Sequence, residues 1–303
     1  MKLSNSAIVI SGAGGLVGSA LVQRLSGKGI AVRKLVRKAA NGPDEIHYDV
    51  DSRTIDSQSL EGTYAVIHLA GESIFGRWSA EKKRRILESR VAGTRFITEC
   101  IAGLSNPPRV LLCASAIGFY GNRGDEIVDE TSARGMGYLA DVCEDWENAT
   151  RPARDAGIRA VNMRLGIVLS PKGGALQQML TPFRLGLGGP VGNGRQFASW
   201  VAMNDVLSAI EFLLVTESIA GPVNVVAPNP VTNAEFSKIL GRVLSRPAFL
   251  PVPGFVLRLI FGEAADEFLL AGQRVLPRKL EEAGFQFHLP ELEPALRHLL
   301  GKG

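Results

Sequence analysis

The chain has 303 residues, of which 46% are hydrophobic and 21% are charged, and these values are typical of a globular protein with a sizeable core. A formal net charge of +4 is too small to indicate nucleic-acid binding, and the basic run at 82–85 has no interleaved aromatic residues. The three cysteines are far apart and the four histidines are scattered, so neither a disulfide framework nor a metal site is expected. No apolar run reaches membrane-spanning length, and 7–10 is too short for a signal-peptide core; we expect a cytoplasmic protein.

Apolar segments of strand length alternate with segments of helical periodicity along the first three quarters of the chain. The expected strands cover 7–11, 30–36, 64–69, 109–114, 159–169 and 223–227, and the expected helices cover 16–26, 79–102, 139–156 and 204–215. Ser79 is placed to cap the second of these helices. Strands separated by helices predict an α/β fold with a Rossmann-type, doubly wound parallel sheet.

The alternation of strand-like and helix-like segments becomes less regular after residue 170. A glycine-rich loop occupies 186–194, and from residue 228 onward the chain is mostly helical in pattern and interrupted by prolines. We therefore expect a Rossmann domain at 1–227, which includes a substrate-side segment at 171–200. A smaller, mostly helical C-terminal lobe would follow at 228–303.

The first expected strand runs directly into the sequence Gly-Ala-Gly-Gly-Leu-Val-Gly at 12–18. Glycines at 12, 15 and 18 permit a tight turn, a close approach of backbone to a pyrophosphate, and close packing of helix on sheet. The amides at the helix start would hold phosphates. This context favours a dinucleotide site over a merely structural turn, and its expected contacts are Gly12, Gly14, Gly15, Leu16, Val17 and Gly18.

The second expected strand ends at Val36-Arg37-Lys38. An NAD-selective site usually has an acidic residue there to accept a hydrogen bond from the ribose 2′-hydroxyl, whereas a cation suits the 2′-phosphate of NADP. We therefore predict NADP(H), with a solvated Arg-Lys pair as the alternative. Asp49, at the end of the next short strand, is a candidate acceptor for the adenine amino group.

The glycine turn, the Val36-Arg37-Lys38 segment and several further segments together resemble one known protein family. The further segments include 68–72, 115–121, 145–147 and 196–205, so the resemblance covers nearly the whole chain. The sequence resembles the atypical extended short-chain dehydrogenase/reductases of the NAD(P)-dependent epimerase/dehydratase family, in the subgroup with a helical C-terminal domain of unknown function. The resemblance implies further cofactor contacts at Leu69, Ala70, Gly71, Arg85, Arg90 and Val168. Without it, Arg85 reads as one more member of a solvated charge run.

Typical family members use a Tyr-x-x-x-Lys pair, in which the lysine lowers the tyrosine pKa so that the phenol transfers a proton. No tyrosine of this chain has a lysine four places later; the pairs are Tyr48 and Ser52, Tyr64 and His68, Tyr120 and Gly124, and Tyr138 and Val142. Ser115, at the end of the fifth strand, and Tyr138 are the remaining catalytic candidates. Ser115 would polarise a carbonyl or cap a strand end, and Tyr138 would transfer a proton or pack.

The expected substrate-side residues are Tyr120, Arg195, Gln196 and Trp200, although Trp200 is equally compatible with a core position. The sequence thus predicts an NADP(H)-binding, epimerase-like oxidoreductase acting on a small carbonyl or hydroxyl compound, or on a nucleotide-linked one. The alternative is a catalytically inactive NADP(H)-binding sensor or regulatory protein. Nucleic-acid and membrane partners are not expected, and the protein would be a monomer or a homodimer.

Overall fold

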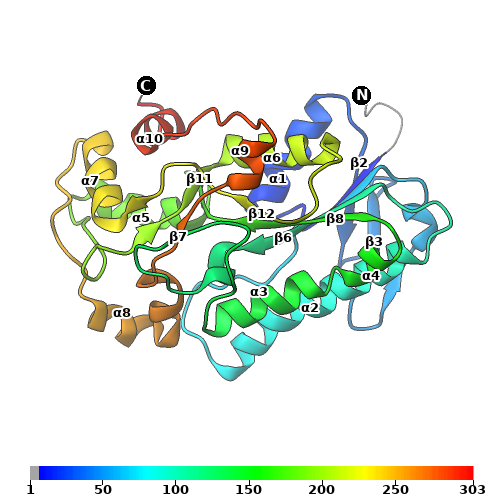
Figure 1. Ribbon diagram of the computed structural model, residues 1–303, viewed down its shortest axis with the longest axis horizontal. Coiled ribbons are helices and arrows are strands. Elements are labelled where there is room, and N and C mark those ends of the chain that lie inside the picture. The colour runs from blue at the N-terminus through cyan, green and yellow to red at the C-terminus, as the bar shows by residue number, and fades with distance from the viewer. Residues whose placement is uncertain (1–6, 303) are drawn as a thin grey trace.

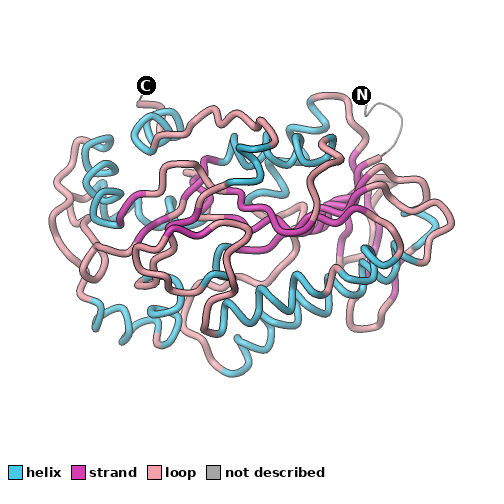
Figure 2. The backbone as a smooth tube through the Cα atoms, in the orientation of Figure 1, coloured by secondary structure: helices cyan, strands magenta, loops and turns pink. Residues whose placement is uncertain are grey.

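The computed structural model describes residues 7–302 and has one large, mainly parallel sheet between two layers of helices (Figures 1 and 2). The eight strands lie in the order β12-β8-β6-β5-β1-β2-β3-β4, and only the β3–β4 pair is antiparallel. In chain order they are β1 Ile8–Ser11, β2 Val32–Val36, β3 Glu45–Asp49, β4 Thr54–Ile55, β5 Ala65–His68, β6 Val110–Ala116, β8 Arg159–Leu165 and β12 Gly221–Val225. The predicted doubly wound α/β fold is confirmed.

Two groups of helices cover the two faces of this sheet, as Figure 1 shows above and below the strands. On one face α1 (Leu16–Gly27) and α6 (Met203–Val215) pack over β1 and β5. On the other face lie α2 (Ala80–Ala102), α3 (Tyr138–Asn148) and α4 (Arg151–Asp155). Each face buries a contiguous apolar cluster, which is the main source of stability in such a fold.

Two expected elements are each divided in the structure. The helix expected at 139–156 ends at Asn148 and restarts as α4, because Pro152 has no N–H to donate to the carbonyl of residue 148. The strand expected at 159–169 breaks at Gly166, where a Cβ atom would lie 2.6 Å from the Ser199 carbonyl oxygen. Beyond this break β9 (Ile167–Leu169) leaves the large sheet and pairs with β11 (Trp200–Ala202).

Several segments after β9 form a smaller lobe with its own core, whereas α6 and β12 return to the large sheet. There α5 (Gly174–Arg184), α7 (Asn233–Leu244) and α10 (Leu292–Leu299) pack around Trp200. Segment 171–200 therefore packs with C-terminal helices, while the domain boundary at 228 stays a prediction. The remaining elements are β7 Ile127–Val128, β10 Phe197–Ala198, β13 Val231–Thr232, β14 Arg274–Val275, α8 Gly254–Phe261, α9 Arg278–Glu282, two 3₁₀ turns (Ser57–Leu60 and Ile117–Tyr120) and a π-helical turn at Ala265–Leu269.

Two features are missing from residues 7–302. No helix in that range combines the length and the apolar character that crossing a membrane requires. In the same range no three His, Cys, Asp or Glu side chains are grouped so that they could hold a metal ion.

Candidate functional site

The register of the sheet brings three loops to one edge. Ser11 at the end of β1 lies beside Leu35 of β2 and His68 of β5. The residues that follow these strands therefore emerge side by side at the carboxyl edge, where open α/β sheets place their ligands. Val36 to Lys38 and Leu69 to Gly71 thus flank the glycine turn at 12–18.

The glycine turn is packed so closely that side chains are excluded from two of its positions. Gly12 has a φ of +70°, and a Cβ atom there would lie 2.7 Å from the Ala70 nitrogen. At Gly18 a Cβ atom would lie 2.1 Å from the Gly12 carbonyl oxygen, so α1 lies directly against the turn. Gly14 has no atom within 4 Å of the same position, which leaves its outer side open.

The first turn of α1 faces this opening. Its N-cap is Gly15, which has no side chain to cap the helix, and no acidic residue lies in the first turn. The amides at this end lack intrahelical acceptors and carry the positive end of the helix dipole. These features fit a pyrophosphate, as expected for Gly12 to Gly18. Apolar side chains of Leu16, Val17, Leu69 and Val168 all pack against the core cluster on this face of the sheet.

A buried histidine lies beneath the turn. The Ser11 hydroxyl accepts a hydrogen bond from the Leu69 amide (3.2 Å) and forms a second hydrogen bond, 2.5 Å long, with His68 Nδ1. The other ring nitrogen, Nε2, is buried and has no hydrogen-bond partner among the described residues. Burial lowers the pKa of His68 to about 4 from 6.5. The Ser11–His68 bond joins β1 to β5 where the two loops begin.

We expect this histidine to make the protein acid-sensitive. Because its folded-state pKa is depressed, its contribution is fully present above pH 6.5 and is lost as the pH falls towards 4. A depression of that size corresponds to about 3 kcal/mol of unfolding free energy. Urea denaturation of the parent and of His68→Gln at pH 7 and pH 4.5 measures it. Equal acid-induced losses of stability in both proteins would contradict this assignment.

Arg90 supports the loop that follows β5. Its guanidinium donates to the Glu72 carbonyl oxygen (2.9 Å), lies 5.0 Å from the Trp146 ring centroid, and would be 3.4 Å from a Cβ atom on Gly71. Burial lowers the Arg90 pKa. The Arg90 guanidinium therefore lies under the loop and holds it in position. A direct contact between Arg90 and the cofactor stays a prediction.

Cations gather on the open side of the same loop. The pKa of Glu72 is lowered mainly by its hydrogen bond with Lys82, whose Nζ lies 2.6 Å from the Glu72 carboxylate. The charges of Arg85 and Arg37, which are both exposed, lower it further. Arg37 follows β2, whereas Lys82 and Arg85 belong to α2, so positive charge from two elements surrounds Glu72 and would stabilise an anionic group there.

Asp49 lies at the same carboxyl edge, two residues past the pairing of His47 with Val36. Its carboxylate accepts hydrogen bonds from the Ser52 hydroxyl (2.8 Å) and from the Asp51 amide (2.9 Å). These bonds hold the pKa of Asp49 below its usual value. The carboxylate is thus fixed and ionised at the edge, and its contact with adenine remains a prediction.

Ser115 belongs to a buried polar network on the α3 side of the sheet. Its hydroxyl donates to Glu147 Oε1 (2.7 Å), and Glu147 forms a two-point ion pair with Arg164 at 2.7 and 2.8 Å. Arg164 also donates to the Tyr120 hydroxyl, which in turn donates to Asn224. A serine has one proton to give. Since Glu147 receives it here, Ser115 is not arranged to polarise a carbonyl.

The hydroxyl proton of Tyr138, at the start of α3, is also used in a hydrogen bond within the protein. Its hydroxyl donates to the Lys83 carbonyl oxygen at 2.5 Å, and the Lys83 ammonium lies 4.4 Å from the ring centroid. Burial raises the Tyr138 pKa. A catalytic phenol needs the opposite shift, so this arrangement does not reproduce the Tyr-x-x-x-Lys pair.

The four expected substrate-side residues have different surroundings. Trp200 is fully buried and donates to the Asn229 carbonyl, so its indole is part of the core, and Tyr120 is fully buried in the network around Arg164. Gln196 donates to the carbonyls of Val191 and Leu269, which ties the glycine-rich loop to the C-terminal lobe. Arg195 is exposed, so a ligand can reach its side chain.

Four residues that shape the site were not predicted from the sequence; they are Glu147, Arg164, His68 and Lys82. Their partners are 10 to 57 positions away along the chain, so local pattern gives no warning of the contacts. A usable signal existed for two of them: charged residues stood within apolar elements, Arg164 in a strand and Glu147 in a helix beside Trp146. Buried charges require partners.

Residues 8–226 match the model of the NAD dependent epimerase/dehydratase family, and residues 252–299 match a domain of unknown function, DUF1731. The chain belongs to the NAD dependent epimerase/dehydratase family. This confirms the resemblance seen in the sequence, including the C-terminal domain. The Tyr-x-x-x-Lys pair that is typical of the family is missing from this member.

Relatives within the epimerase/dehydratase family match over nearly full length. An epimerase family protein of Mycobacterium bovis is 42% identical over 295 residues, which are 97% of each chain. The crystal structure of human epimerase family protein SDR39U1 (isoform 2) with NADPH is 34% identical, has a TM-score of 0.90, and is matched over 98% of this chain and 100% of that one. A nucleoside-diphosphate sugar epimerase from Corynebacterium glutamicum is 38% identical, with a TM-score of 0.82 over 99% of this chain and 59% of that chain.

Proposed function

We propose that this chain binds NADP(H) at the carboxyl edge of its sheet. The observation that supports this most strongly is the turn at 12–18, in which Gly12 and Gly18 pack where no side chain fits and leave the α1 amides open. The related human structure with NADPH supports the same cofactor. In this proposal the turn and α1 hold the pyrophosphate, and Leu69, Ala70 and Gly71 lie against the adenosine ribose and pyrophosphate.

The choice of the phosphorylated cofactor rests on the cations beside the turn. Arg37 and Lys38 directly follow β2, and Arg85 approaches the same loop from α2. We assign the 2′-phosphate to this cluster because guanidinium groups form short, charge-assisted hydrogen bonds with phosphate oxygens.

We further propose an oxidoreductase that acts on a small carbonyl or hydroxyl compound, or on a nucleotide-linked one. The nicotinamide of the bound cofactor would donate or accept a hydride. Because Glu147 and the Lys83 carbonyl hold the Ser115 and Tyr138 protons, water would supply the proton when a carbonyl is reduced and accept it when an alcohol is oxidised. The relationship to a nucleoside-diphosphate sugar epimerase supports the nucleotide-linked class.

A second candidate is an NADP(H)-binding sensor or regulatory protein without turnover. The same two hydrogen bonds favour it, since neither expected catalytic hydroxyl is arranged to transfer a proton. In that case the cofactor would change the contacts of the C-terminal lobe, which touches α3 through Glu267. This carboxylate accepts hydrogen bonds from the amides of Tyr138 and Leu139.

Turnover separates the two candidates. The absorbance of NADPH is followed with a panel of aldehydes, ketones and nucleotide-linked sugars, and with matched alcohols in the presence of NADP. We expect consumption with at least one compound and a loss of less than about tenfold in kcat for Tyr138→Phe, because removing a true acid or base costs about 10²–10⁴-fold. Tight NADPH binding without turnover on the whole panel would contradict the oxidoreductase proposal and support the sensor.

A further inference from the structure

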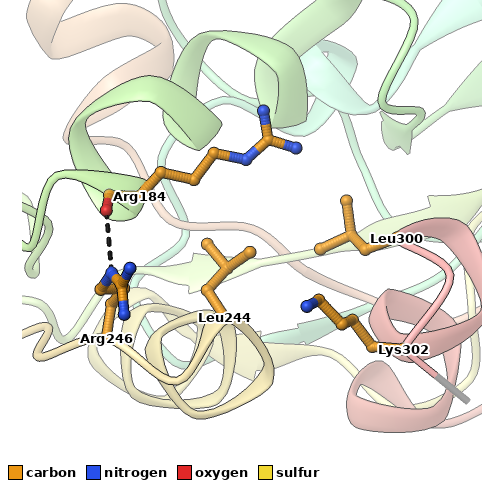
Figure 3. Close-up of a pocket in the computed structure, with 5 residues that line it drawn as sticks. All are labelled: Arg184, Leu244, Arg246, Leu300 and Lys302. Atoms are coloured by element: carbon orange, nitrogen blue, oxygen red, sulfur yellow. Dashed lines mark hydrogen bonds between the residues drawn. The ribbon is translucent and has the colours of Figure 1, made fainter.

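A cavity at the opposite end of the fold from β3 and β4 is lined by cations. The C-terminal ends of α5, α7 and α10 meet around a volume of about 250 Å³ (Figure 3). Its lining residues are Arg184, Leu244, Arg246, Leu300 and Lys302. Arg246 Nε donates to the Arg184 carbonyl oxygen at 3.0 Å, and this hydrogen bond joins the C-terminal ends of α5 and α7. The Arg184 guanidinium projects over the cavity (Figure 3).

The cations that line this cavity have no ion-pair partner among residues 7–302. None of the ion pairs formed within residues 7–302 includes Arg184, Arg246 or Lys302, whereas Arg242 on α7 pairs with Glu293 at 2.6 Å. Cations at helix C-termini also interact with the helix dipoles. Each helix end contributes about half a negative charge, so three ends offset roughly half of the three positive charges. Among residues 7–302, a net positive charge therefore remains at this cavity.

Exposed apolar side chains border the cavity along the chain. The segment after Arg184 runs beside the segment after Arg246, with hydrogen bonds from Leu250 to Gly188 and from Val252 to Pro190. Leu185 is 69% exposed and Phe249 is 72% exposed. The second segment leads into α8, where several further apolar residues are exposed; they are Phe255, Leu259 and Ile260.

Helix α8 adds an unpartnered apolar side to this end of the molecule. Phe255 and Leu259 are 70% and 74% exposed and are four positions apart, so they lie next to each other on one side of the helix. Figure 1 shows α7, α8 and α10 at the same end of the molecule. Several large apolar side chains exposed at one end of a molecule exceed the scattered single residues that need no explanation, and they favour an interaction site there.

We propose that this basic and apolar end, comprising the cavity, Leu185, Phe249 and the exposed side of α8, binds an anionic phospholipid surface. Lipid phosphates are attracted to Arg184, Arg246 and Lys302, while the exposed leucine and phenylalanine side chains enter the boundary between headgroups and acyl chains. The cavity is smaller than the usual 300–1,000 Å³ of a small-molecule site, so it accepts a headgroup phosphate and not a whole dinucleotide.

The charge pattern favours a lipid surface over a second copy of the chain. A two-fold symmetric dimer apposes the same patch of both subunits. Here that would bring two sets of unpaired cations together, with no carboxylate of the cavity lining to meet them. An anionic bilayer supplies both the negative charge and the apolar medium that the exposed side chains require.

Sedimentation with vesicles tests this proposal on the full chain. The parent is expected to sediment with phosphatidylcholine vesicles that contain phosphatidylglycerol, and to be released by high salt. Pure phosphatidylcholine is expected to retain little protein. Arg184→Ala/Arg246→Ala should lower the partition coefficient by roughly 30-fold, since two surface cations are removed. Leu259→Ser should lower it several-fold without a folding defect, because that side chain is exposed.

The matched control is Arg151→Ala/Arg154→Ala, which also removes two positive charges. These two arginines belong to α4, which packs on the large sheet and does not line the cavity. This control should retain binding within about threefold. Lack of binding by the parent, or an equal loss in this control, would overturn the proposal. A parent that dimerises in sedimentation velocity and becomes monomeric with Leu259→Ser would assign this end to self-association instead. NADPH affinity, measured on every variant, should not change.

Discussion

Replacing Arg164 with methionine should lower the free energy of unfolding by about 3–5 kcal/mol, because Glu147 would keep a buried charge without its partner. Arg164 and Glu147 side chains are only 3% and 11% exposed, so water does not replace the lost interaction. Ser115 and Tyr120 would each also lose a member of their network. Urea denaturation at neutral pH, in which the midpoint and the slope are both fitted, measures this loss.

The control for that experiment removes both charges. In Arg164→Met/Glu147→Leu no buried charge is left unpaired, and substituting a buried pair by apolar residues is often close to neutral. The double variant should therefore recover a large part of the stability lost by Arg164→Met. If Arg164→Met alone costs less than 1 kcal/mol, the ion pair does not organise the network around Ser115.

Gly18→Ala should damage both folding and NADPH binding. The added Cβ atom would lie 2.1 Å from the Gly12 carbonyl oxygen and 3.0 Å from the Ala13 Cα atom, so backbone has to move. Forced overpacking of this kind costs about 1–3 kcal/mol. We expect a comparable loss of stability and, since the displaced turn is the proposed pyrophosphate site, a roughly tenfold to hundredfold weaker affinity for NADPH. Thermal denaturation and calorimetric titration measure the two effects.

The matched control is Gly14→Ala in the same turn. A Cβ atom there meets nothing within 4 Å and the backbone has no positive φ, so the stability of the protein without cofactor should change by less than about 0.5 kcal/mol. Identical destabilisation by Gly14→Ala and Gly18→Ala would show that glycine flexibility matters and that the contact between α1 and the turn does not.

Local pattern was sufficient for the elements that position the cofactor. The alternation of strands and helices predicted the parallel sheet, and Ser79 caps α2 as expected by accepting a hydrogen bond from the Lys82 amide. The glycine spacing predicted the strand–turn–helix unit, in which Gly12 and Gly18 lie too close to backbone atoms for a side chain to fit. Two-residue strands such as β7 were not predicted, since their pairing partners lie far along the chain.

The hydrogen bonds and the packing of individual side chains could not be predicted from local sequence pattern. Ser115 was a reasonable catalytic candidate from its place at a strand end, yet its proton goes to Glu147, 32 positions away. Trp200 was compatible with both a site and a core, and only the packing of α5, α7 and α10 places it in the core. Such contacts depend on how whole elements pack, which periodicity does not specify.

The measurement that tests the central claim most directly is a calorimetric comparison of NADPH with NADH in the parent and in Arg37→Ala. We expect NADPH to bind the parent at least about tenfold more tightly than NADH does, since a charge-assisted hydrogen bond contributes about 1.5–3 kcal/mol. In Arg37→Ala this preference should largely disappear while NADH affinity changes little. Equal affinities of the parent for the two cofactors would contradict the assignment of the 2′-phosphate to Arg37.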